Sequence, residues 1–247
     1  MSINWFKYAS PVSFYPLAGR LIPWFVVVTV VLLFIGLYLG FFVAPTDYQQ
    51  GEAYRIMFVH VPAAWMSMFI YLVMAAYAGL GLIFNTRLSS MMATALAPTG
   101  AMFTFLALWT GALWGKPMWG AWWVWDARLT SELILLFLYL GFMSLQAAID
   151  DPRRAARASA LLALVGAVNV PIIYFSVKWW NTLHQGASIS FDKAPSMATT
   201  MLVAMLIMAV AFWTYTIAVV LQRVRCEILE RERHSDWVIA LVQEKQA

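Results

Sequence analysis

Six long apolar stretches, separated by short polar connections, dominate the chain. They extend over residues 21–43, 56–83, 91–114, 130–149, 158–178 and 197–221. Each is long enough to cross a bilayer as an α-helix, which takes about 20 residues. The short connections favour neighbouring helices that pack antiparallel. The pattern predicts an all-α membrane protein with six transmembrane helices in one bundle over residues 1–221, followed by a helical tail over 222–247.

Composition and charge agree with this pattern. The chain is 63% hydrophobic and only 11% charged, far from the values of soluble proteins. The termini and the connections near 84–90 and 150–157 hold eleven Lys and Arg residues, whereas the other side holds Arg55, Lys116, Arg128, Lys178 and Lys193. Because positive connections stay in the cytoplasm, both termini are predicted to be cytoplasmic. The net charge of +4 therefore needs no nucleic-acid partner.

Two local features refine the predicted helices. Asn169 and Pro171 interrupt the fifth apolar stretch, which indicates an interhelical hydrogen bond and a kink. In the tail, Glu227 and Arg231 are four residues apart, a spacing that supports an exposed cytoplasmic helix. The single cysteine, Cys226, also lies there, which excludes a disulfide and a Cys-x-x-Cys-His attachment site.

Tryptophans are concentrated around the outer connection that follows the third stretch. Trp109, Trp114, Trp119, Trp122, Trp123 and Trp125 fall within seventeen residues. An aromatic belt would explain some of them, but belts occur at both membrane interfaces and the inner side has few. If residues 119–126 are helical, Trp119, Trp122, Trp123 and Asp126 share one face and form an apolar platform in the interface. Such a platform suits a large planar ligand.

Two of the three histidines, His60 and His184, lie on the predicted outer side, and His234 lies in the tail. Each alone is explained by an interfacial hydrogen bond. Together, two neutral imidazoles can fill both axial positions of a haem iron while indole rings cover the porphyrin. Zinc takes three or four ligands, and no suitable carboxylate–histidine cluster accompanies this pair. We expect haem b as the ligand, with Trp114, Trp119, Trp122, Trp123 and Trp125 as candidate contacts.

Charged residues near this segment have two explanations each. Arg128 and Arg55 are candidates for binding the haem carboxylates, because arginine binds carboxylates in a bidentate manner. Arg128 could instead pair with Glu132 one turn along the helix. Asp126 could fix the tautomer of an imidazole or cap the helix that begins near Thr130. The sequence leaves these alternatives open.

Residues 119–130, WGAWWVWDARLT, resemble the tryptophan-rich signature of the haem-handling membrane proteins of cytochrome c maturation. The resemblance extends to residues 47–50, 54–55, 60–64, 114–117 and 179–186, the last ending in Gln185 and Gly186. Ala127 departs from the proline that some members carry.

The resemblance implies haem held at the periplasmic face of the bacterial inner membrane, with His60 and His184 as axial ligands. It implies transfer to a periplasmic haem chaperone, with Asp47, Gln50 and Arg55 at that contact. A small single-span membrane subunit and the membrane and ATPase subunits of an ABC transporter are the other implied partners, besides membrane lipid.

Two other functions are compatible with the sequence. A permease for another solute would use the tryptophans as interfacial anchors, and a structural subunit of the ABC complex would explain the few ionisable groups within the spans. The outer connections contain no evident nucleophile or acid–base pair, so we expect a carrier rather than an enzyme. Whether haem is exported or captured from the outer leaflet stays open.

Overall fold

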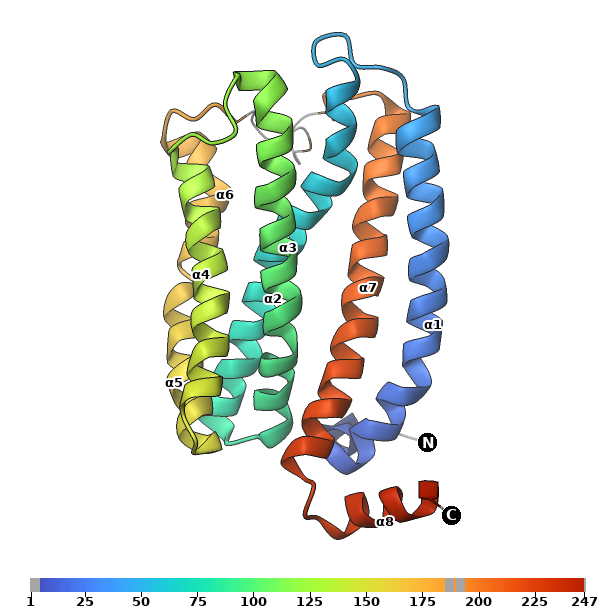
Figure 1. Cartoon of the computed structure of the whole chain (residues 1–247), viewed down its shortest axis with the longest axis vertical. Helices are drawn as coiled ribbons and strands as arrows, with labels where there is room; N and C mark the ends of the chain where they lie inside the picture. The colour runs from blue at the N-terminus through green and yellow to red at the C-terminus, as the bar shows by residue number, and fades with distance from the viewer. Residues whose placement is uncertain (1–4, 185–188, 190–193, 247) are drawn as a thin grey trace.

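The computed structural model describes residues 5–184, 189 and 194–246 of the chain, and every regular element among them is helical (Figure 1). Gln185, Gly186 and Lys193, which figure in the sequence predictions, lie outside the described residues. The α-helices are α1 (Pro11–Tyr38), α2 (Met57–Phe84), α3 (Arg87–Trp119), α4 (Ala127–Ala148), α5 (Pro152–Gly166), α6 (Asn169–Trp179), α7 (Thr199–Arg231) and α8 (Asp236–Gln246). Short helical turns are η1 (Trp5–Ala9), η2 (Leu39–Val43) and η3 (Glu52–Ile56).

The predicted six-span architecture is confirmed. Six helical segments are long and apolar enough to cross a membrane: Pro11–Val43, Glu52–Phe84, Arg87–Trp119, Ala127–Ala148, Pro152–Trp179 and Thr199–Arg231. The first span begins ten residues before the apolar stretch at 21–43, because Pro11 suits the first turn of a helix.

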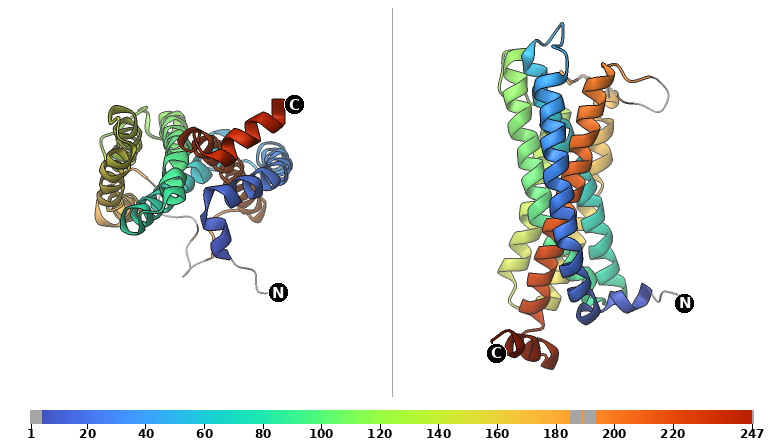
Figure 2. Two further views of the ribbon diagram at one scale, coloured as in Figure 1. Left: turned by 90° about the horizontal axis from the view of Figure 1, so that it is seen from below. Right: turned by 90° about the vertical axis from the view of Figure 1, so that its right-hand side faces the viewer.

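The spans form two groups that meet along α7. Helix α1 packs along α7, while α2 to α6 form the second group, and α7 also contacts α2 and α3 (Figure 1). The connections 44–51, 120–126 and 180–184 lie at one end of the bundle, which we call the loop end. Helix α1 begins and α8 lies across the bundle at the opposite, terminal end (Figure 2). That the terminal end is cytoplasmic stays a prediction.

The fifth span is broken where the sequence predicted. Helix α5 ends at Gly166 and α6 begins at Asn169. The Asn169 side chain donates from Nδ2 to the backbone carbonyl of Ser131 on α4, at 2.8 Å. The predicted interhelical hydrogen bond and interruption are therefore both confirmed.

The centre of the second group is packed around two buried tyrosines. Tyr71 of α2 and Tyr139 of α4 meet edge to face, with 4.9 Å between ring centroids. A Cβ atom at Gly100 would lie 2.1 Å from the ring of Tyr139, so only glycine lets α3 approach α4 this closely. This packing places α2, α3 and α4 in mutual contact below the loop end.

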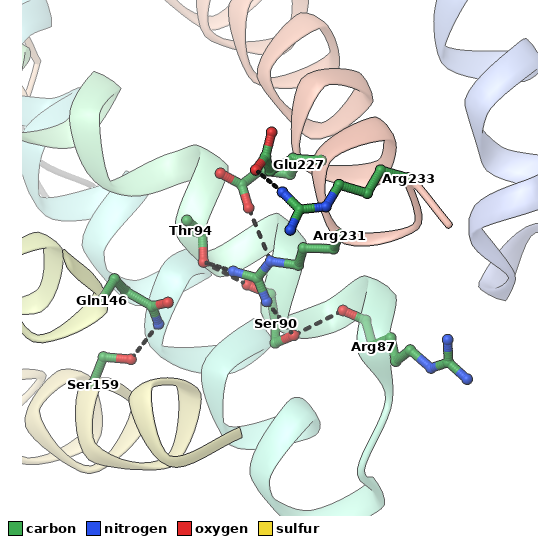
Figure 3. A network of polar contacts seen from close by, with 9 residues as sticks. Arg87, Ser90, Thr94, Gln146, Ser159, Glu227, Arg231 and Arg233 are labelled. Atoms are coloured by element: carbon green, nitrogen blue, oxygen red, sulfur yellow. Dashed lines mark hydrogen bonds and ion pairs between the residues drawn. The ribbon is translucent and has the colours of Figure 1, made fainter. Parts of the chain in front are cut away.

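At the terminal end, the division of the chain at residue 221 stays a prediction. Helix α7 continues as one helix to Arg231, so residue 221 falls inside it, and α8 alone is a separate tail helix. The predicted Glu227–Arg231 pair forms, with Arg231 Nε 3.0 Å from Glu227 Oε2. Arg231 also donates to Thr94 and Ser90 of α3, which ties the extension of α7 to the bundle (Figure 3).

Candidate functional site

His60 lies in the first turn of α2, where its ring rests on α3. Its Nδ1 is 3.1 Å from Oγ1 of Thr110, and a Cβ at Gly111 would lie 3.0 Å from its Cε1. The Thr110 hydroxyl donates its only hydrogen to the carbonyl of Leu106, 2.6 Å away, so it can only accept from His60. The proton of His60 therefore belongs on Nδ1, which leaves the lone pair of Nε2 free.

His184 follows α6 and faces the beginning of α4. Its Nδ1 lies 3.6 Å from Oδ2 of Asp126, slightly beyond hydrogen-bond distance, and its ring meets Trp119 edge to face at 5.0 Å between centroids. Asp126 Oδ1 accepts from the backbone N–H of Leu129 at 2.8 Å. The expected capping role is confirmed, although α4 begins at Ala127 rather than near Thr130. The same carboxylate also lies beside an imidazole.

The environment of His184 keeps its imidazole neutral. Burial, and to a smaller extent the positive charge of Arg128, lower the pKa of His184 from 6.5 to about 4, although Asp126 opposes both effects. The neutral imidazole, which is the form that binds metals, therefore predominates at physiological pH. His60, His184 and Arg128 lie within electrostatic range of one another, although they come from three separate parts of the chain.

The tryptophan-rich segment is not helical, which corrects the premise of a helical platform. Helix α3 ends at Trp119, Gly120 has φ 76°, and residues 120–126 are extended or bent. The left-handed conformation at Gly120 ends the helix and turns the chain back toward α4. As a result, the face shared by Trp119, Trp122, Trp123 and Asp126 does not exist.

The tryptophans of the segment separate into two environments. Trp119 contacts His184, and Trp123 packs edge to face against Trp125 at 5.4 Å between centroids. Trp122 instead lies beside the ammonium of Lys116 at 5.8 Å, and it is 55% exposed. The structure therefore brings Trp119 to an imidazole and leaves Trp122 near the surface.

Arg128 lies in the first turn of α4 and makes few hydrogen bonds to the described residues. One hydrogen bond, 3.3 Å from Nη1 to the carbonyl of Ile173, engages its guanidinium. No ion pair joins it to Glu132, whose Oε1 instead accepts from the hydroxyl of Ser67 at 2.7 Å. Arg128 therefore makes no direct ion pair with Glu132, although the two charges act on each other, and most of its N–H donors have no contact within the described part of the chain.

Arg55, which we predicted as a candidate for binding a haem carboxylate, has its guanidinium engaged by other groups. Its guanidinium pairs with Glu52 and donates to the carbonyl of Ala44 at 3.2 Å and to that of Gly40. It therefore fastens the connection 44–51 to the end of the first span. The structure does not bring its guanidinium together with Arg128.

The connection 44–51 reaches the site through Gln50. Asp47 Oδ1 accepts from the backbone N–H groups of Gln49 and Gln50, which forms a tight turn. Gln50 Oε1 then accepts from Trp114 Nε1 at 2.9 Å, and Trp114 packs edge to face on His60 at 5.7 Å between centroids. The sequence analysis did not predict the hydrogen bond between Trp114 and Gln50 or the contact between His60 and Thr110. A polar residue one turn before Trp114 is the signal that could have indicated Thr110.

Three buried polar atoms of the site have no hydrogen-bond partner in the described part of the chain: Trp123 Nε1, Asp126 Oδ2 and His184 Nδ1. Residues 5–184, 189 and 194–246 also contain no group of three or more His, Cys, Asp and Glu that could hold a metal ion. Two imidazoles with free Nε2 atoms, flat indole rings and an underused guanidinium are the groups that would bind an iron porphyrin and its carboxylates. The residues present therefore fit haem.

Comparison with known proteins gives a consistent result. The chain matches the family described as Heme exporter protein C over residues 4–239. Similar proteins named Heme exporter protein C come from Bradyrhizobium diazoefficiens, 54% identical over 92% of this chain and 86% of the relative, and Haemophilus influenzae, 49% identical over 96% of each. The Escherichia coli K12 protein of that name is 48% identical over 95% of this chain and 94% of its own. With six spans and these bacterial relatives, the chain is a multi-pass protein of the bacterial inner membrane.

Proposed function

The chain belongs to the heme exporter protein C family, and we propose from this premise that it binds haem at the loop end and passes it on for c-type cytochrome maturation. It acts as a carrier rather than an enzyme. The site lies on the periplasmic side, as the distribution of Lys and Arg predicts.

The observation that carries the proposal is that His60, in the first turn of α2, and His184, in the segment after α6, lie at the same end of the bundle (Figure 1). They come from α2 and from the segment after α6, lie within electrostatic range of each other, and each directs Nδ1 toward an oxygen of another element. An imidazole held at Nδ1 offers Nε2 to a metal in a fixed orientation. His60 and His184 therefore serve as the axial ligands of the haem iron.

Other residues bind the remainder of the haem molecule. Trp119 and Trp114, each in contact with one of the two histidines, supply apolar surface for the porphyrin. Arg128 supplies free N–H donors for a carboxylate. Trp123 and Trp125 extend the apolar surface outward, and Trp125 is 77% exposed. An exposed rim is compatible with a ligand that must leave again.

The haem passes to a periplasmic chaperone at the turn formed by Asp47 to Gln50. Tyr48 at its tip is 91% exposed, and Gln50 links the turn to Trp114. The small single-span subunit and the ABC transporter subunits are the remaining proposed partners. An Asp47→Asn variant keeps an oxygen that accepts from the turn but removes the charge, so it should retain haem and transfer less of it to the chaperone.

Absorption spectra of the purified protein test the haem site. We expect a six-coordinate haem spectrum, oxidised and reduced, that weakens or changes in His60→Ala and in His184→Ala. His234→Ala is the matched control, because this exposed histidine lies at the terminal end. Unchanged spectra in both site variants would contradict the ligand assignment. A haem-free wild type that supports solute flux in vesicles would favour the permease instead.

A further inference from the structure

A buried carboxylate links the two helices that carry the haem site. Glu132 of α4 is 7% exposed and accepts from the hydroxyl of Ser67 on α2 at 2.7 Å. In the described part of the chain it makes no hydrogen bond to the proposed haem ligands or to Arg128. Placing an ionisable group inside a membrane bundle is costly, so its presence requires a reason.

A second residue of α4 binds the same point of α2. Tyr139, seven residues after Glu132 and two turns along the same face, donates from its hydroxyl to the backbone carbonyl of Ser67 at 2.8 Å. Ser67 itself is fully buried and also lies 2.8 Å from the carbonyl of Ala64. One residue of α2 is thus held by two side chains of α4.

This contact lies close to His60 along α2. Ser67 follows His60 by seven residues, which is two turns on the same face of the helix. Pro62 lies between them and has no backbone N–H, so α2 lacks one of its own hydrogen bonds there. On α4, Glu132 follows Asp126 by six residues, and Asp126 faces His184. The contact between Ser67 and Glu132 therefore joins the element of one histidine to the element that orients the other.

We propose that Glu132 is a positioning residue that, through Ser67, holds α2 against α4 and sets the separation between His60 and the Asp126–His184 pair. The inference rests on the proposed haem site and adds a residue to it. Losing the contact lets α2 shift at Pro62, and His60 then no longer reaches the position in which it completes the axial pair.

The test compares Glu132→Leu with Glu132→Gln in the full-length protein. Glutamine retains a side-chain oxygen and an N–H that can bond Ser67, whereas leucine retains only the volume. We expect Glu132→Leu to weaken haem binding roughly fivefold, the effect of losing one hydrogen bond, and to convert part of the six-coordinate spectrum to five-coordinate. Added imidazole should restore the six-coordinate spectrum, and Glu132→Gln should resemble the wild type.

Gln146→Leu is the matched control for a merely structural effect. Gln146 also lies on α4 and donates to another helix, to Ser159 of α5 at 2.5 Å, but at the terminal end (Figure 3). It should lower thermal stability without changing the haem spectrum. A six-coordinate spectrum in Glu132→Leu equal to that of Gln146→Leu would overturn the inference.

His60→Ala, measured in the same series, separates this inference from the proposed function. If His60→Ala changes the spectrum and Glu132→Leu does not, the haem site stands and the role of Glu132 is wrong. If neither changes it, the proposed ligand pair itself is wrong. Tyr139→Phe gives an independent second measurement, because it removes the other contact to Ser67 and should produce a smaller spectral change in the same direction.

Discussion

The two ends of the bundle differ in whether their buried polar groups have hydrogen-bond partners. At the terminal end, Arg231 bonds to Glu227, Ser90 and Thr94, and Trp237 Nε1 donates to Glu232 at 2.8 Å. At the loop end, Trp123 Nε1, Asp126 Oδ2 and His184 Nδ1 are buried without partners in the described part of the chain. Among the described residues, three comparable atoms lie away from the loop end: Tyr71 Oη and Thr99 Oγ1 within the bundle, and Arg225 Nε, whose guanidinium lies 4.3 Å from the ring centroid of Tyr15.

The difference separates polar residues that stabilise the fold from those that bind a ligand. A buried polar group without a partner costs about 1–3 kcal/mol. Most such groups at the terminal end have Ser, Thr and Glu side chains as partners, whereas three of the six without a partner in the described part of the chain gather at the loop end. Asp126 Oδ2 and His184 Nδ1, which lie 3.6 Å apart, are expected to close into a hydrogen bond when Nε2 of His184 binds the haem iron.

Asp126 should produce the largest effect short of removing an axial ligand. Asp126→Ala removes both the cap of α4 and the carboxylate beside His184. We expect haem affinity to fall about 10- to 100-fold, as is usual when a residue that orients a metal-binding histidine is lost. The helix should also lose about 1 kcal/mol of stability through the missing cap. Haem titration and thermal unfolding measure the two effects.

Asp126→Asn separates the two roles of this residue. Asparagine is as good a cap as aspartate but carries no charge. The variant should therefore keep the stability of the wild type and still lose most of the haem affinity. Equal haem affinity in Asp126→Asn and the wild type would mean that Asp126 acts only as a cap.

Replacing Thr110 should produce the next largest loss of haem affinity. Thr110→Val keeps the shape of the side chain but removes the acceptor for His60 Nδ1, so the imidazole is free to rotate. We expect haem affinity to fall about tenfold. Thr104→Val is the control, because Thr104 lies on the same helix and its hydroxyl bonds only the carbonyl of Gly100. If the two variants bind haem equally well, Thr110 does not orient His60.

The spans were predicted correctly from the sequence, and the proposed ligand pair was identified there, whereas the contacts that support the pair were not. Apolar stretches of about 20 residues have one stable structure in a bilayer, which is why the six spans and the break at Asn169 were predicted correctly. The prediction of a helical platform was wrong because it used only the spacing of three and four residues between side chains. It left out the effect of Gly120, whose left-handed conformation ends α3.

The supporting residues depend on distant parts of the chain. Thr110 in an apolar helix usually bonds its own backbone, and its position one turn before Trp114 does not by itself show that it also accepts from a residue of α2. The spacing of Arg128 and Glu132 suggested an ion pair between them. In the structure the carboxylate of Glu132 instead accepts a hydrogen bond from Ser67. Such contacts follow from the three-dimensional arrangement of α2, α3 and α4.

Replacing Gln50 should lower haem affinity by a smaller factor. The result distinguishes a role through Trp114 from a role at the contact with the chaperone. In Gln50→Leu, Trp114 loses the acceptor of its Nε1–H but remains packed near His60. We expect about a fivefold loss of haem affinity, equivalent to one hydrogen bond of about 1 kcal/mol. If haem affinity is unchanged and only transfer to the chaperone declines, Gln50 acts at the partner contact and not through Trp114.

Replacing Arg231 should leave the haem spectrum unchanged, and this variant is the sharpest test of the difference between the two ends of the bundle. Arg231→Met removes the hydrogen bonds to Glu227, Ser90 and Thr94, so the free energy of unfolding should fall by about 1–3 kcal/mol, as thermal unfolding would show. Arg233→Met, which breaks only the exposed pair with Glu230, should leave stability unchanged. Thr94 and Thr110 lie on the same helix, α3, which is the route by which the two ends would be coupled. An altered haem spectrum in Arg231→Met would therefore show that the two ends are coupled through α3, whereas an unaltered spectrum with lowered stability would show that they act independently.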